Sequence, residues 1–365
     1  MRPSFVTAAL VAAALPLVAA GAPAQEPAPP PAAQSSAAQA GAEPEKTRRP
    51  GFFDAETPLE ITLTTNLKQI RGDKRDQAPW RPATVTFAGP DGAPKTVPVQ
   101  IRTRGNWRLK NCHFPPIRMN FVKDSVKGTA LARLDKPKLV NYCRDDDPSE
   151  QYVLQEFQLY RIYNLLTPHS QRARLLRTTY KDQESGKVLT TRWAFVIEEP
   201  EVMAERTGTT LVEEKGATVN DLDHKAMAFV GLYQYLIANT DFSIGALHNI
   251  ELLRDKVGNH YPVAYDFDHA GAVNARYAVP NEKLPIRSVR QRLFRGYCVS
   301  PESYEPAVAL FNEKKDAIYA LYSDDIGKLM SPKVAKETLE YFDDFYEKIN
   351  DPRALKRDIV DACVK

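Results

Sequence analysis

The fold of this chain is restricted first by alternating apolar residues in its N-terminal half. Between Leu59 and Phe121, apolar side chains recur at every second position, in stretches separated by turn residues such as Gly89-Pro90-Asp91-Gly92. The stretches run over Leu59–Leu63, Val85–Phe87, Val97–Ile101 and Ile117–Phe121. A period of two places such side chains on one face of a strand. We therefore expect a layer of antiparallel strands in this part.

The pattern changes at Asp147-Pro148-Ser149-Glu150. Asp147 suits a helix cap, Pro148 suits the first helical position, and a Glu three residues after the cap completes a capping box. Apolar residues then recur at helical spacing as far as Leu165. This pattern predicts a helix over Pro148–Leu166.

The rest of the chain mixes both periods, with more helix toward the C-terminus. We expect strands at Leu176–Lys181 and Val188–Ile197, a largely buried helix at Asp223–Ala238, and a hairpin of His248–Arg254 with Tyr261–Tyr265. Amphipathic segments predict helices at Ala307–Leu321, Pro332–Ile349 and Ala354–Ala362. These patterns together predict an α+β protein.

The first residues read as an export signal. A basic Arg2, an apolar run and the small residues Ala22-Pro23-Ala24 predict a cleavable signal peptide over residues 1–24. An uncleaved anchor is the alternative, but the run is interrupted by Pro16 and is short for a membrane span. Residues 25–50 are rich in Ala and Pro and predict a disordered linker, followed by one globular domain over residues 51–365. We expect no membrane span after cleavage, and a periplasmic, cell-surface or extracellular location.

The balance of charge argues against a nucleic-acid partner, and the number of cysteines favours disulfides. Lys plus Arg number 49 against 46 for Asp plus Glu, so no strong positive charge favours a nucleic-acid partner. Four cysteines in an exported chain favour two disulfides, and we prefer Cys112 with Cys143 and Cys298 with Cys363, because each pair lies within one half of the chain. Four reduced, buried thiols are the alternative. The oligomeric state stays open.

Polar residues with the chemistry of phosphoryl transfer lie between Asn239 and Gly271. A predicted helix ends at Asn239-Thr240-Asp241, His248-Asn249 opens the predicted hairpin, and Asp266-Phe267-Asp268 follows it. Phosphoryl transfer uses one carboxylate to orient the attacking hydroxyl, with an Asp and an Asn to hold a divalent ion. Alone, each of these residues can equally be a turn residue.

Together with Arg104-Gly105-Asn106, Asp147-Pro148-Ser149 and the run Trp193 to Glu198, this succession resembles the spore-coat CotH-type kinases, a branch of the atypical protein-kinase-like fold. The resemblance covers about Val97 to Gly271. It implies a two-lobed protein-kinase-like fold, with a β-rich N-terminal lobe over about residues 51–199 and a helical C-terminal lobe over about residues 200–365. It also implies ATP and Mg²⁺ or Mn²⁺ as cofactors and an exported or cell-envelope protein as substrate.

The resemblance implies a role for each matching residue. Asp241 becomes the catalytic carboxylate, Asn249 and Asp266 become metal ligands, and Asp268 competes with Asp266. Arg104 would lie over the phosphates, and Glu198 near the nucleotide base. A kinase also needs a cation for the phosphates; the chain offers Arg118 or Lys138, with Glu156 as a possible ion-pair partner, and we prefer Arg118 because a guanidinium also grips phosphate.

Two departures from the family pattern keep other functions open. The chain has no unambiguous phosphate-binding Lys and no glycine-rich loop of the kinase type. One alternative is therefore a catalytically inactive pseudokinase or envelope-binding module. A second alternative is a metal-dependent hydrolase that uses Asp241, Asp266, Asp268 and His269. The histidines match no zinc motif.

Overall fold

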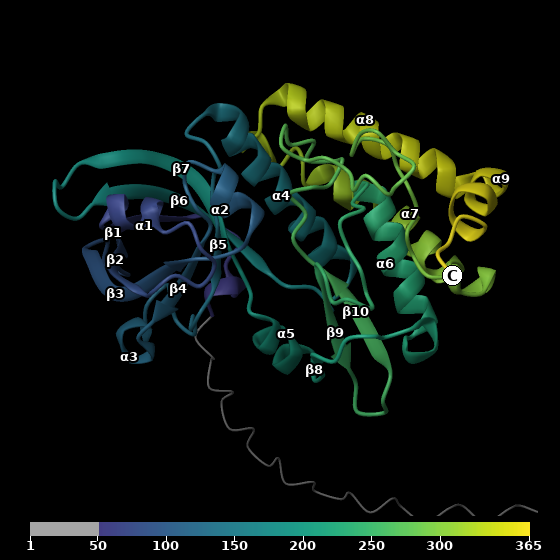
Figure 1. The fold of residues 1–365 in the computed structure, drawn as a ribbon, viewed down its shortest axis with the longest axis horizontal. Helices are drawn as coiled ribbons and strands as arrows, with labels where there is room; N and C mark the ends of the chain where they lie inside the picture. Colours follow the sequence, from purple (N-terminus) through teal and green to yellow (C-terminus); the bar gives the residue numbers. More distant parts are fainter. Residues whose placement is uncertain (1–50) are drawn as a thin grey trace, which may run out of the picture. The chain divides into compact units, whose positions relative to one another are not determined.

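Seven strands from the first half of the described chain close into a barrel (Figure 1). The computed structural model describes residues 51–365, so the predicted signal peptide (1–24) and linker (25–50) lie outside the described residues. Around the barrel the order is β1-β2-β3-β4-β5-β7-β6. The strands are β1 (Leu59–Thr65), β2 (Arg81–Ala88), β3 (Pro94–Thr103), β4 (Ile117–Phe121), β5 (Lys138–Val140), β6 (Ala173–Asp182) and β7 (Val188–Ile197).

The closed barrel corrects the predicted fold. The α+β content and the strands themselves were expected, but the two-lobed protein-kinase-like fold, with a β-rich N-terminal lobe and a helical C-terminal lobe, is wrong, because the seven strands form a closed barrel. β1 pairs in parallel with β6, with Leu59 opposite Leu176, and this pair joins the two edges of the sheet. The other neighbouring strands are antiparallel. A closed sheet has no free edge.

The predicted alternation fills the barrel. Leu63, Val85, Ile101 and Ile117 come from four successive strands, and their side chains are fully buried in the barrel core. Polar residues between them face outward, as the period of two requires. Three short helices lie in the segments that connect the barrel strands: α1 (Leu67–Gly72), α2 (Trp107–Asn111) and α3 (Lys123–Val126).

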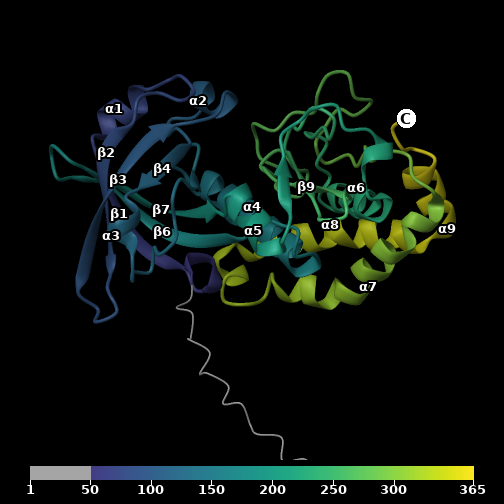
Figure 2. The same cartoon turned by 90° about the horizontal axis from the view of Figure 1, so that it is seen from below.

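Helix α4 (Asp147–Leu166) lies between the barrel and the remaining helices (Figure 2). It begins one residue earlier than expected because Asp146, not Asp147, caps it by accepting from the backbone N–H of Ser149. Its Phe157 and Tyr160 rings pack 5.6 and 5.5 Å from the Phe195 ring of β7. Helix α4 also contacts α7 (Glu305–Ala320).

The C-terminal half is mainly helical and carries one small sheet. Its other helices are α5 (Pro200–Thr207), α6 (His224–Ile237), α8 (Pro332–Asn350) and α9 (Pro352–Leu355), and the sheet has the order β10-β9-β8, with β8 (Thr210–Val212), β9 (Ile250–Arg254) and β10 (His260–Ala264). The expected segment at Ala354–Ala362 is part of α9 followed by a π-helical turn, Lys356–Val360. Helix α6 is buried along most of its length, as its apolar sequence predicts.

Both expected disulfides are present. Cys112 is bonded to Cys143, and Cys298 to Cys363. The first bond ties the residue after α2 to the segment before α4. The second ties the C-terminal residues to the loop before α7.

Candidate functional site

Asp241 lies just beyond the end of α6. The helix ends at Ile237 with Ala238 as its C-cap, and the side chain of Asn239 accepts from the backbone N–H of Asp241, which turns the chain toward the hairpin. The Asp241 carboxylate is about half exposed, and its Oδ1 lies 3.0 Å from Nε2 of His248. Each carboxylate oxygen can accept more than one hydrogen bond, so a donor from solvent still has access.

Asn249 contacts Asp241 directly. Its Nδ2 donates to the backbone carbonyl of Asp241 at 2.8 Å and lies 3.3 Å from Oδ2. The donating nitrogen therefore faces Asp241. The Asn249 oxygen Oδ1 has no hydrogen bond among the described residues, which leaves a hard oxygen donor free.

Asp266 follows β10 on the other arm of the hairpin. The backbone N–H of its neighbour Tyr265 donates to the carbonyl of Asn249, so the two arms meet here. The backbone N–H of Asp266 donates to the Tyr160 hydroxyl of α4 at 2.9 Å. Its carboxylate has no hydrogen bond or ion pair within residues 51–365. The structure thus brings Asp241, Asn249 and Asp266 to one end of the hairpin.

Left-handed backbone conformations mark the same segment. Ala238, Leu247, Asn249 and Asp266 have φ angles of 50°, 49°, 53° and 61°. Asn and Asp tolerate this region, whereas Ala and Leu adopt it at a cost of about 1–2 kcal/mol. Such conformations cluster at functional sites, where surrounding contacts hold the backbone in place.

A buried acidic cluster lies beside the hairpin end. Asp268 is 7% exposed and accepts from the Tyr277 hydroxyl, and Glu156 of α4 is 2% exposed with Oε1 unpartnered among the described groups. Burial, together with repulsion from Asp268 and Asp266, raises the pKa of Glu156 well above its usual range. Burial and repulsion from Asp266 also raise the pKa of Asp268. Asp266 is therefore the more accessible carboxylate of the Asp-Phe-Asp run.

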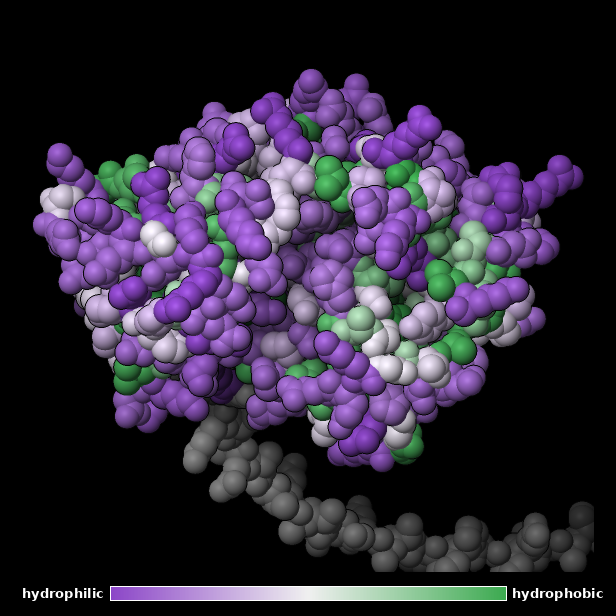
Figure 3. All heavy atoms as spheres, viewed as in Figure 1, coloured by the Kyte–Doolittle hydropathy of each residue, from purple (hydrophilic) through white to green (hydrophobic). Residues whose placement is uncertain are grey.

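Two buried cations that form no ion pair within residues 51–365 lie close enough to Asp266 to be attracted to it. Nε of Arg104 is buried without a hydrogen bond, and its guanidinium makes no ion pair within the part of the chain described here. Lys138 of β5 places Nζ 4.7 Å from the centre of the Tyr265 ring, and burial beside Arg104 lowers its pKa. Both cations are attracted electrostatically to Asp266. Figure 3 shows a recess with mainly hydrophilic walls between the barrel and the helical part.

Arg118, the cation preferred from the sequence, lies directly opposite Lys138 in the pair of β4 with β5. Its Nε donates to the carbonyl of Lys136, so part of its guanidinium is engaged within the barrel. Lys138 instead packs against Tyr265, the neighbour of Asp266. Lys138 is thus better placed for an anion held near Asp266.

Glu198 has a structural environment. Its side chain is fully buried and forms ion pairs of 2.7 Å with Arg172 and 2.9 Å with Arg206. The side chain of Gln171 also donates to its backbone carbonyl. These contacts use both carboxylate oxygens, so the predicted place near a nucleotide base has no free acceptor on this side chain.

Sequence reasoning missed Arg108, Tyr277 and Glu251. Arg108 of α2 donates to the carbonyl of Asn141 and is attracted to Asp268 and Glu156. Glu251 of β9 is attracted to Lys138, although burial raises its pKa. Glu251 lies in β9 two residues after Asn249, and no sequence motif singled it out.

The site has no preformed cage for a metal ion. Within residues 51–365, no group of three or more His, Cys, Asp or Glu side chains is arranged to hold one. His269, a member of the hydrolase alternative, packs 6.0 Å from the Trp107 ring and 5.8 Å from the Tyr277 ring.

The location of the protein is indicated only coarsely. The two disulfides are typical of an extracellular or periplasmic protein. Among the described residues, no helix combines the length and the apolar character that crossing a bilayer requires.

Comparison with known proteins gives no family: no family model matches the chain, and no curated protein matches it.

Proposed function

We propose that this protein transfers the γ-phosphoryl group of ATP, with Mg²⁺ or Mn²⁺, to a hydroxyl group of an exported or cell-envelope protein. The observation that carries the proposal is the meeting of Asp241, Asn249 and Asp266 at one hairpin end, next to Arg104 and Lys138. The barrel fold argues neither for nor against this activity, because a catalytic activity depends on the residues of the site, and unrelated folds can carry the same activity.

The donor set fits a divalent ion held partly by phosphates. Mg²⁺ is usually bound through one or two carboxylates and substrate phosphates, not by a cage made only of protein groups. Asp266 and Oδ1 of Asn249 are free oxygen donors of the required kind. A divalent ion there would neutralise charge on the nucleotide phosphates.

The chain's own residues would do the rest. Arg104 and Lys138 would bind phosphate oxygens, which would compensate two cations that form no ion pair in the described structure. Asp241 would orient the attacking hydroxyl by accepting its hydrogen bond, with His248 and Asn249 fixing the carboxylate. The hydroxyl oxygen of Tyr160 would hold Asp266 in place by accepting a hydrogen bond from the backbone N–H of Asp266.

A labelling assay tests the proposal. Purified protein is incubated with γ-³²P-labelled ATP, Mg²⁺ or Mn²⁺, and exported proteins of the source cell. We expect labelling that Asp241→Asn abolishes, and that Asp325→Asn, at a fully exposed carboxylate between α7 and α8, leaves intact. Labelling that is absent, or equal in both variants, would contradict phosphoryl transfer.

A protein that binds nucleotide without transferring phosphate is the second candidate. It is favoured by the engagement of both Asp241 oxygens with His248 and Asn249. Calorimetry with ATP and Mn²⁺ separates the two: this candidate gives binding that depends on Asp266 but no labelling. The hydrolase alternative has less support, because Asp268 is buried against Tyr277.

A further inference from the structure

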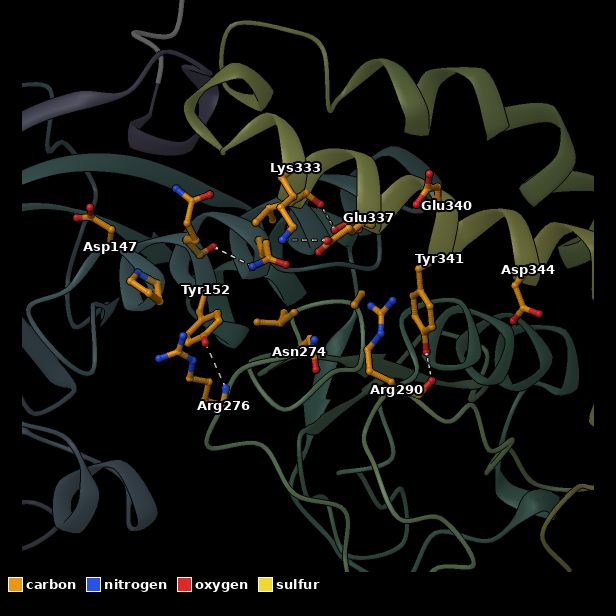
Figure 4. Close-up of a pocket in the computed structure, with 17 residues that line it drawn as sticks. Asp147, Tyr152, Asn274, Arg276, Arg290, Lys333, Glu337, Glu340, Tyr341 and Asp344 are labelled. Atoms are coloured by element: carbon orange, nitrogen blue, oxygen red, sulfur yellow. Dashed lines mark hydrogen bonds and ion pairs between the residues drawn. The ribbon is translucent and has the colours of Figure 1, made fainter.

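A groove of about 930 Å³ lies between α4 and α8 (Figure 4). One wall is the N-terminal half of α4, with Tyr152 and Gln155, and the other wall is α8, with Glu337 and Tyr341. Its floor is the loop that follows Asp268, including Val273 and Asn274. The groove is thus built on the same loop as Asp266.

The acidic residues of the groove are already compensated. Each of its four carboxylates has a cationic partner: Asp147 pairs with Arg192 at 2.8 Å, Glu337 with Lys333 at 3.8 Å, Glu340 with Lys336 at 3.6 Å, and Asp344 with Arg292 at 2.5 Å. Counted together with these four cations, the carboxylates add no net negative charge to the groove.

The arginines of the groove are not compensated. Arg276 is exposed, and its side chain makes no hydrogen bond or ion pair within residues 51–365. Asp146, to which it is attracted, lies beyond ion-pair distance and caps α4. Arg290 donates to the carbonyl of Gly271 and stacks 3.8 Å from the Tyr341 ring, but it contacts no carboxylate in the described structure.

The excess of positive charge continues along the loop. From Arg276 to Arg295 the chain holds Arg276, Lys283, Arg287, Arg290 and Arg295, besides Arg292, which is paired with Asp344, against a single acid, Glu282. Lys283 and Arg287 are exposed. A local excess of one charge attracts a ligand of opposite charge and speeds its binding.

This basic loop wraps the end of α6 that leads to Asp241. Arg292 donates to the carbonyls of Tyr235 and Leu236, and Arg295 donates to those of Thr240 and Phe242. A segment bound along the loop would therefore run toward the residue that we assign to the acceptor hydroxyl.

We propose that the groove and the loop Asn274–Arg290 form a docking surface for an acidic segment of the acceptor protein. The assignment of the ligand as acceptor rests on the proposed function, whereas the binding itself does not. Isolated carboxylates can reach Arg276, Arg290 and the free amide of Asn274. A nucleic acid is not favoured as the ligand, because Lys plus Arg number only 49 against 46 for Asp plus Glu over the whole chain.

Binding can be measured without catalysis. The probe is a short fluorescein-labelled peptide of alternating Glu and Ser, titrated with the mature protein in the absence of ATP and read by fluorescence anisotropy. We expect binding that weakens as salt is added. The double variant Arg276→Glu with Arg287→Glu should weaken it by about tenfold or more, since two attractions become repulsions.

The control is a second double variant that changes the net charge of the protein by the same amount at positions outside the groove and the loop. Lys68→Glu with Lys95→Glu reverses two exposed lysines on the barrel side, and it should leave the affinity within about twofold. Equal weakening by both double variants would overturn the proposal, as would an oligothymidylate of the same length that binds more tightly than the peptide. Peptide binding that survives while the labelling assay fails would refute phosphoryl transfer and leave the docking surface standing.

Discussion

The side-chain nitrogen of Asn249 donates to the backbone carbonyl of Asp241 at 2.8 Å and lies 3.3 Å from its carboxylate. This contact joins the end of α6 to the start of β9, and it fixes which Asn249 atom faces Asp241. Two residues of the candidate site therefore depend on one amide.

Asn249→Asp should destabilise the protein. The substitution places an acceptor and a second negative charge against two acceptors of Asp241, and an unmade buried hydrogen bond costs about 1–3 kcal/mol. Urea denaturation gives the free energy of unfolding. Asn274→Asp is the control, because Asn274 also has a left-handed φ, of 52°, but is exposed and has no side-chain hydrogen bond in the described structure. Equal loss in both variants would show that the contact has no special weight.

The fold was predictable only as far as local patterns reach. Alternation identified β1 to β4, and helical spacing identified α4 and α6, because each pattern reports one face of one element. Barrel closure depends on the pair Leu59 with Leu176, whose partners lie far apart in sequence. The periodicity of apolar residues within one strand does not reveal which distant strand it pairs with, so the sequence could not distinguish an open layer from a closed barrel.

The site divides in the same way. Asp241, Asn249 and Asp266 were predictable as neighbours because a helix end and two hairpin arms lie close in the chain. Arg108 and Lys138 reach the site from distant parts of the barrel. The choice between Arg118 and Lys138 could not be made from sequence, since they lie opposite each other on adjoining strands and differ only in their contacts: Arg118 donates to Lys136, whereas Lys138 packs against Tyr265.

The buried Glu156 predicts a dependence of stability on pH. Its pKa is raised in the folded state, so the folded protein binds this proton more tightly than the unfolded chain does. The stabilisation from that proton is complete below the unfolded pKa of about 4.3 and is lost as pH rises through the folded pKa. Glu156→Gln removes this loss of stability at high pH, because the Gln side chain does not ionise. The variant should gain stability over the native protein at pH 8, and the difference should shrink as pH falls toward 5.

Thermal unfolding of both proteins across this pH range measures the effect. Glu340→Gln is the matched control, because it makes the same chemical change at an exposed carboxylate of α8. That variant should track the native protein at every pH. A difference for Glu156→Gln that stays constant with pH would contradict a raised pKa at this position.

Removing either disulfide should lower stability substantially. The bonds close segments of 31 and 65 residues. Loss of either should cost about 4 kcal/mol, with the longer segment costing slightly more, if the bond acts by restricting the unfolded chain. Double Cys→Ser variants at each pair, denatured with urea, measure both values. Reductant should destabilise the native protein and leave a variant without all four cysteines unchanged.

Gly271 predicts how tightly the loop after Asp268 is held against α6. Its backbone N–H donates to the carbonyl of Ala238, and a Cβ at position 271 would lie 2.2 Å from the carbonyl oxygen of Val289 and 2.9 Å from Cβ of Ala238. Backbone cannot move aside as a flexible side chain can, so Gly271→Ala should destabilise the protein by about 1–3 kcal/mol.

The same substitution should also weaken peptide binding in the anisotropy assay, because the displaced loop carries Arg276 and Arg290. Gly72→Ala is the matched control, since a Cβ there meets no atom within 4 Å. It should leave peptide affinity unchanged and should not lower the free energy of unfolding, which a helical Gly→Ala raises by about 0.4–1 kcal/mol where Cβ fits. If Gly271→Ala lowered stability but left peptide affinity at the native value, the loop's position would not matter to docking, and the groove would have to bind through α4 and α8 alone.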